Sequence, residues 1–186
     1  MNAKKKIVSV ALAASLAATA IVGGTLAYFT DTDNADNVFT VGNVDIALTE
    51  PNWDNGGKED AVNMYPGEVV SKDPTVTNVG NNPCLLRVKI EWPENVDLDY
   101  LTDGVEYKLG DNWTARDGVY YYQSILEPTK TTDALFDEIR LDPATTNAQT
   151  GEYDIKVTAE AVQSEGFTGT LTPESMADWF AACMGE

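Results

Sequence analysis

The feature that most constrains the fold is an alternation of apolar and polar side chains over residues 152–163. One parity carries Tyr153, Ile155, Val157, Ala159 and Ala161, and the other carries Asp154, Lys156, Thr158 and Glu160. Successive side chains of a β-strand point to opposite faces, so this pattern predicts a strand with one face in a core. The alternation is the clearest in the chain, and we therefore expect this strand to occupy a central position.

Residues 84–92 show the same period. Leu86, Val88, Ile90 and Trp92 share one face, and Leu85, Arg87, Lys89 and Glu91 share the other, which is typical of a half-buried strand. Further strands are predicted over residues 38–48, 69–79 and 132–141. A hairpin is predicted over residues 113–126, with its turn at Arg116-Asp117-Gly118. Residues 50–66 and 94–111 are polar or acidic, and we expect them to be loops.

Local signals refine these elements. The apolar parity changes at Gly42, which predicts a β-bulge there. Pro74 cannot donate a ladder hydrogen bond and therefore indicates an edge strand or a bulge. Thr172 followed by Pro173 predicts the start of a short C-terminal helix. The residues at helical spacing that should face the rest of the fold are Met176, Trp179, Phe180 and Cys183.

Seven or so short strands separated by turns, with one terminal helix, predict an all-β fold, an antiparallel β-sandwich. The length suits a single domain over residues 28–186.

The N-terminus has the pattern of a secretory signal peptide. Lys4, Lys5 and Lys6 precede an apolar run over residues 7–22, and a glycine pair ends that run. Thr25-Leu26-Ala27 places a small residue before a cut, so we expect cleavage between Ala27 and Tyr28. Residues 1–27 would then contact the membrane only before cleavage. A retained anchor over residues 7–29 is the competing interpretation.

The same region carries a family resemblance. Residues 23–50 read GGTLAYFTDTDNADNVFTVGNVDIALTE, and further blocks lie at 66–67, 72–78, 87–90 and 154–167. These blocks resemble the TasA/camelysin family of secreted Gram-positive proteins, which a SipW-type signal peptidase processes. The resemblance implies a jelly-roll domain of the biofilm matrix or cell surface that assembles into fibres. It also implies an alternative, because camelysin-type members have been classed as casein-cleaving metallopeptidases.

Charge limits the partners. Cleavage removes three lysines and no acidic residue, which leaves nine basic against thirty acidic side chains and a net charge of −21. Nucleic acid is therefore excluded as a partner, since its binding depends on basic groups that neutralise phosphates.

The sequence shows no catalytic constellation. It contains no histidine, which excludes histidine-based triads and zinc sites of the HExxH type. We therefore predict no catalytic residues, no cofactor and no enzyme, and a peptidase would have to use carboxylates alone. Asp31, Asp33 and Asp36 are either ligands for calcium or solvated charge at the start of a strand.

Two further sets of residues leave alternatives open. Cys84 and Cys183 allow one intramolecular disulfide, and equally well they are two thiols that never meet. The run Tyr120-Tyr121-Tyr122 is either a glycan platform, as in a surface adhesin, or cross-strand packing within a sheet, and we favour packing.

The segment that cleavage exposes suggests how copies assemble. Residues 28–38 carry the apolar anchors Tyr28, Phe29 and Val38 with acidic residues between them, which is too polar for a core strand. Such a segment can pair with an open sheet edge of a neighbouring molecule. The contact is head-to-tail and does not close, so we expect self-association into filaments.

Overall fold

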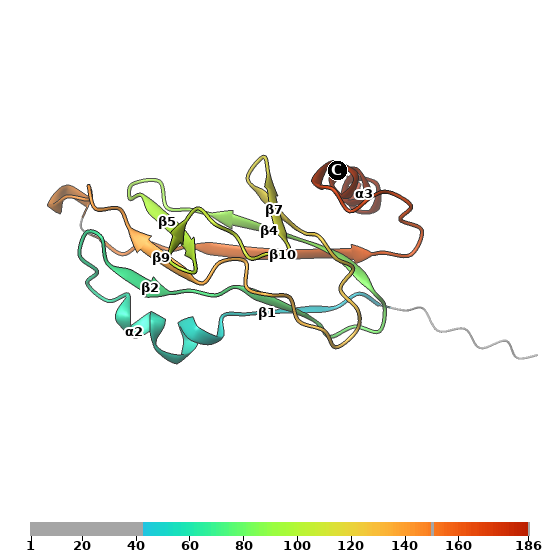
Figure 1. Cartoon of the computed structure of the whole chain (residues 1–186), viewed down its shortest axis with the longest axis horizontal. Coiled ribbons are helices and arrows are strands. Elements are labelled where there is room, and N and C mark those ends of the chain that lie inside the picture. Colours follow the sequence, from blue (N-terminus) through green and yellow to red (C-terminus); the bar gives the residue numbers. More distant parts are fainter. Residues whose placement is uncertain (1–42, 150, 186) are drawn as a thin grey trace, which may run out of the picture. The chain divides into compact units, whose positions relative to one another are not determined.

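Antiparallel pairing organises the described part of the chain, which is residues 43–149 and 151–185 of the computed structural model (Figure 1). One four-stranded sheet has the order β10-β4-β8-β7, a second has the order β2-β9-β5-β6, and β1 pairs with β3 alone. The predicted antiparallel all-β fold with a C-terminal helix is therefore confirmed. The strands are β1 (Ile46–Thr49), β2 (Val69–Ser71), β3 (Thr75–Asn78), β4 (Cys84–Glu91), β5 (Leu98–Thr102), β6 (Val105–Glu106), β7 (Trp113–Arg116), β8 (Val119–Tyr122), β9 (Glu138–Leu141) and β10 (Lys156–Gln163).

Several predictions from the N-terminal sequence lie outside the described residues. They are the signal peptide, its cleavage between Ala27 and Tyr28, the segment 28–38, the bulge at Gly42 and the cluster Asp31, Asp33 and Asp36. Val41–Glu186 forms one unit of the chain, and the unit before it, Met1–Thr40, is not described.

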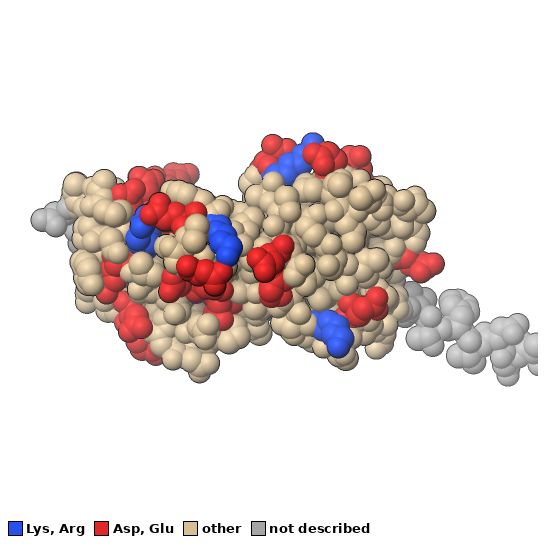
Figure 2. Space-filling view, viewed as in Figure 1, with Lys and Arg blue, Asp and Glu red and all other residues tan. Residues whose placement is uncertain are grey.

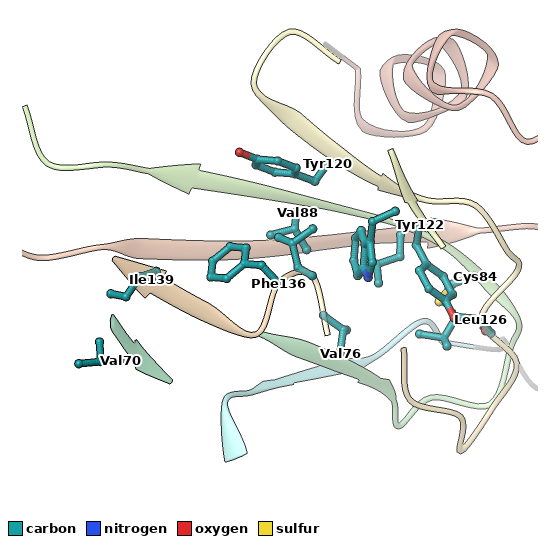
Figure 3. Packing of buried hydrophobic residues seen from close by; sticks show 12 residues of the cluster. Val70, Val76, Cys84, Val88, Tyr120, Tyr122, Leu126, Phe136 and Ile139 are labelled. Atoms are coloured by element: carbon teal, nitrogen blue, oxygen red, sulfur yellow. Dashed lines mark hydrogen bonds between the residues drawn. The ribbon is translucent and has the colours of Figure 1, made fainter. Parts of the chain in front are cut away.

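The main core lies between the sheets (Figure 3). The first sheet contributes alternate residues of β4 and β8, among them Val88, Tyr120 and Tyr122. Val70, Val76 and Ile139 face them from β2, β3 and β9. Connecting segments complete the core with Leu126, Leu135 and Phe136, all of them at most 2% exposed. Of the strand predicted over residues 132–141, only Glu138–Leu141 is strand, and the residues before it reach the core from a connecting segment.

The helix α3 (Pro173–Met184) builds a second cluster on the other face of the first sheet. Thr172 caps it as predicted, its hydroxyl accepting a hydrogen bond from the Ser175 amide at 3.4 Å. Met176 and Phe180 are fully buried against Leu85, Tyr121 and Val162. The strand β4 is therefore covered on both faces at its start, and the prediction of a half-buried strand was wrong there.

The predicted loop at 50–66 contains two helical turns, Trp53–Gly57 and α2 (Lys58–Asp60). Their start is fixed by Asp73, whose carboxylate accepts hydrogen bonds from the backbone amides of Asn52 at 2.8 Å and Trp53 at 3.2 Å. This cap comes from twenty residues away, so the local sequence does not show it. The segment 94–111 was also wrongly predicted as a loop, since it forms β5 and β6.

The hairpin of β7 and β8 is confirmed. Asp117 and Gly118 have φ of 51° and 76°, as a two-residue turn of type I′ requires. The interruption at Pro74 is also confirmed, because it separates β2, at an edge of its sheet, from β3. By contrast, β10 is an edge strand and not a central one, and Tyr153 is exposed before it begins.

Candidate functional site

The sheet edges of the described residues differ in how well they are protected. The edge of β2 is blocked by Gly57, whose backbone lies so close that an added Cβ would be 2.1 Å from the Ser71 carbonyl oxygen. At the far side of that sheet, β6 is only two residues long. In the first sheet, β10 is an eight-residue edge strand, and among the described strands it pairs only with β4. Long unpaired edges are templates for another strand, and β10 is the longest one here.

β1 runs beside this open edge without a ladder of hydrogen bonds to it. Near the start of β1, the amide of Asn81 donates to the Asn43 carbonyl at 3.3 Å. Beyond the end of β10, the amide of Ser164 donates to the Pro83 carbonyl at 3.1 Å, in the same turn. The two strands therefore run in opposite directions, and we call the strip between them the β1–β10 seam.

The other end of the seam is a hollow. It has a volume of about 250 Å³, and its lining consists of Leu48, Thr49, Glu50, Asp54, Ile155 and Val157. The apolar members come from the end of β1 and the start of β10, and the two carboxylates belong to the segment that leads into the helical turns. The hollow is smaller than the roughly 300–1,000 Å³ of most ligand pockets, so it suits one side chain better than a metabolite.

The core is incompletely covered along the seam. Seven apolar side chains of the two strands and of the residues just before them pack against the main core and yet remain only half-buried: Val44, Ile46, Leu48, Ile155, Val157, Ala159 and Ala161. In the neighbouring strand β4, Leu86 and Val88 face the same core and are 0% and 1% exposed. The seam therefore leaves part of the apolar core half-exposed.

The charges around the seam are largely paired. The ammonium of Lys72 binds both carboxylate oxygens of Glu50 at 2.9 Å and lies 4.5 Å from the ring centre of Trp53. On β10, Glu160 accepts hydrogen bonds from Arg87 at 2.5 Å and Lys89 at 3.1 Å. Burial alone would raise the pKa of Glu160, but these two cations outweigh it and lower that pKa.

The cysteines are both free thiols in the structure. Cys84 is buried in the main core, where burial, with a smaller effect of the Glu127 charge, raises its pKa to about 11. Cys183 is exposed on α3, although its spacing placed it on the packed face. In the structure the two thiols do not form a disulfide. Because its pKa is raised, the Cys84 thiol stays protonated near neutral pH.

The three tyrosines are at most 8% exposed. Tyr120 and Tyr122 belong to the main core, and Tyr121 lies beneath α3. The interpretation as packing is confirmed, and the hypothesis of a glycan platform at these residues was wrong.

Sequence reasoning missed the seam because it placed β10 at the centre of a sheet. A signal was present, since the inward parity of β10 ends in Ala159 and Ala161. Small residues cover little of a core unless another element packs over them.

Fold and seam together define the class: an antiparallel β-sandwich with one long, uncovered edge. The family model described as camelysin metallo-endopeptidase matches residues 2–107, more than half of the chain. The protein therefore belongs to the camelysin family. A comparison with curated protein sequences gives no match. Over the described ranges, no helix is long and apolar enough to cross a membrane.

The family description implies a metal, and the described residues do not fit one. Within 43–149 and 151–185, no group of three or more His, Cys, Asp and Glu side chains converges on a common point. The whole sequence offers no imidazole ligand. We therefore derive no reaction step through a metal.

Proposed function

We propose that this protein is a secreted structural subunit that assembles into fibres of the extracellular matrix or cell surface of a Gram-positive bacterium. The observation that carries the proposal is the β1–β10 seam, where seven core-facing apolar side chains stay half-buried beside an unpaired edge. An added strand would cover these side chains and pair with β10. The resemblance to TasA-type proteins supports the same role.

The strand we propose for this place is residues 28–38 of a neighbouring copy, released when a SipW-type peptidase cuts between Ala27 and Tyr28. Its backbone would supply the missing ladder, and its apolar residues Tyr28, Phe29 and Val38 would anchor it, with Val38 toward the floor of the seam and Phe29, at the opposite parity, toward the other face of the sheet. Each copy then accepts one segment and donates one, so growth is head-to-tail and open-ended.

Electron microscopy of the purified mature chain, residues 28–186, tests the proposal. We expect filaments from the mature chain and folded monomers from a chain that lacks residues 28–36. A matched control keeps the length and replaces Tyr28, Phe29 and Val38 by serine, and it should also stay monomeric. Equal polymerisation of the shortened chain would refute the role of the segment. N-terminal sequencing of secreted protein checks that the chain starts within a residue or two of Tyr28.

Peptidase activity is the second candidate, because the family description names a metallo-endopeptidase. A general base near neutral pH would have to be a carboxylate with a strongly raised pKa or a thiolate, since histidine is absent. We propose that the purified protein does not cleave casein in a chelator-sensitive manner. Robust cleavage that EDTA abolishes, and that a mock purification lacks, would establish the enzyme instead.

A further inference from the structure

We infer that the incoming segment runs antiparallel to β10, with Val38 of the donor copy in the hollow at the start of β10 and Phe29 beyond its end, near Phe167. The inference rests on the proposed function and adds the direction and register of the contact. It follows from the polarity of the seam, the place where the donor segment leaves its own domain, and the length of that segment.

The first step is the chain direction of β1 and β10 along the seam. β1 ends at the hollow, because Leu48 and Thr49 line it together with Ile155 and Val157. β1 starts at the opposite end, where Asn43 is bonded to the turn that also holds Ser164 after β10. Figure 1 shows the same arrangement, with the β10 arrow pointing to the end of the seam from which β1 comes. A chain that enters β1 therefore travels toward the hollow.

Head-to-tail addition preserves this direction. The donor segment is the chain just upstream of β1, and the proposed head-to-tail growth repeats every copy in the same orientation along the seam. In the accepting copy the segment therefore also runs toward the hollow, as β1 does, and so antiparallel to β10. An antiparallel ladder is also how β10 already pairs with β4, and such pairs are slightly more stable per residue than parallel ones.

Length then sets the register. The nine steps from Phe29 to Val38 span about 30 Å at roughly 3.3 Å per residue. The seven steps from Lys156 to Gln163 in β10 span about 23 Å on the same scale. With Val38 at the hollow, Phe29 falls just past Gln163, where Phe167 and Trp179 form an edge-to-face pair at 5.9 Å. The residues between Val38 and β1 remain as the connection to the donor's own domain.

The hollow suits Val38. Its floor is formed by Leu48, Ile155 and Val157, which match an aliphatic side chain of this size. The carboxylate of Glu50 beside it is held by Lys72, so its charge is compensated. The aromatic pair at the other end offers Phe29 a stacking partner.

Disulfide trapping between two chains tests the inference. Both chains carry Cys183→Ser, which removes the exposed native thiol, while Cys84 stays buried. One chain carries a cysteine in the segment, Val38→Cys or Phe29→Cys, and the other carries Val157→Cys or Phe167→Cys. The chains are mixed, assembled under reducing conditions and then oxidised mildly, and covalent dimers are measured on a non-reducing gel.

We expect dimers from Val38→Cys with Val157→Cys and from Phe29→Cys with Phe167→Cys, at several times the yield of the two exchanged combinations. The exchanged combinations are the matched controls, since they use the same four variants. Filaments that trap Val38→Cys with Phe167→Cys would overturn the inference and leave the proposed function standing. Wild-type mature chain that forms no filaments would instead refute the proposed function.

A second measurement tests the inference in case a cysteine variant does not assemble. A peptide of residues 28–42 carrying a nitroxide at position 38 is added to the chain that lacks residues 28–36, which is expected to stay monomeric with an empty seam, and the broadening of its side-chain NMR signals is recorded. We expect the Val157 signals to broaden and those of Phe167 to stay sharp, with the reverse for a nitroxide at position 29. The opposite assignment would overturn the inference.

Discussion

Asp99 is a buried, hydrogen-bonded carboxylate of β5 in the second sheet. It is 5% exposed, and it accepts hydrogen bonds from the Tyr107 hydroxyl and from Arg140, whose Nε and Nη2 lie 3.2 and 2.5 Å away. Arg140 also binds Glu106 at 2.6 Å. Burial alone would raise the pKa of Asp99, but the bonds from Tyr107 and Arg140 and the charge of Arg140 outweigh it and lower that pKa.

A lowered pKa links Asp99 to stability against acid. The ionised carboxylate favours the folded state, so its contribution is complete above the ordinary aspartate pKa of about 3.9 and is lost as the pH falls through the lower folded value. We expect Asp99→Asn to lower the melting temperature at neutral pH. The difference in melting temperature between Asp99→Asn and wild type should then narrow as the pH approaches about 3.

Thermal unfolding from neutral to acidic pH measures this gap. Asp97→Asn, at an exposed aspartate of the same segment, is the matched control and should show a small gap at every pH. A gap for Asp99→Asn that stays constant down to acidic pH would show that the carboxylate charge contributes nothing.

Among the elements, the helical turn Trp53–Gly57 has the clearest task, since it covers the free edge of β2. Only a glycine fits, because a Cβ at Gly57 would lie 2.1 Å from the Ser71 carbonyl oxygen and 3.3 Å from the Trp53 ring. The turn is held from β2's side by Asp73 and Lys72, through the backbone cap and the contact with the Trp53 ring. The edge that is closed here is the counterpart of the edge that stays open at β10.

We therefore expect Gly57→Ala to reduce the free energy of unfolding by about 1–3 kcal/mol, the usual range for overpacking. Urea denaturation measures it. The neighbouring exposed residue provides the control, and Lys58→Ala should change stability by less than about 0.5 kcal/mol. An unchanged midpoint for Gly57→Ala would mean that the turn does not pack on β2 in solution.

At the scale of the whole molecule, charge opposes assembly. The full sequence contains thirty acidic side chains and only twelve basic ones. Figure 2 shows the acidic side chains spread along one face, with the basic ones standing among them. Most described cations are engaged in ion pairs, so copies that approach one another meet uncompensated negative charge.

Screening should therefore promote filaments. The Debye length falls from about 30 Å at 0.01 M salt to about 8 Å at 0.15 M, so the repulsion between copies weakens over this range. We expect the protein concentration needed for filaments to fall as sodium chloride rises, as followed by sedimentation. A variant with Glu94→Gln and Asp111→Asn, both exposed, should need less salt. Filaments that weaken with added salt would indicate an interface held by ion pairs instead.

The sequence by itself determined the strand class, several strand positions and the core-facing parity of β4 and β10. Alternation in residues 84–92 and 152–163 suffices for this, because the period of two is a local property of the backbone. The same holds for the Asp117-Gly118 turn and the Thr172 cap, whose bonds close within a few residues. The export signal and the assembly role of residues 28–38 also rest on local sequence, and they stay predictions.

Only the tertiary structure decided which strands lie at an edge and which surfaces are covered. The helix α3 buries the second face of β4, Asp73 fixes the helical turns from twenty residues away, and β10 is left without a partner on one side. These outcomes depend on contacts between residues far apart in the chain, and alternation reports only that a strand has an inner face. It does not report whether a neighbour will pair with the strand's edge, because backbone hydrogen bonds are the same for every sequence.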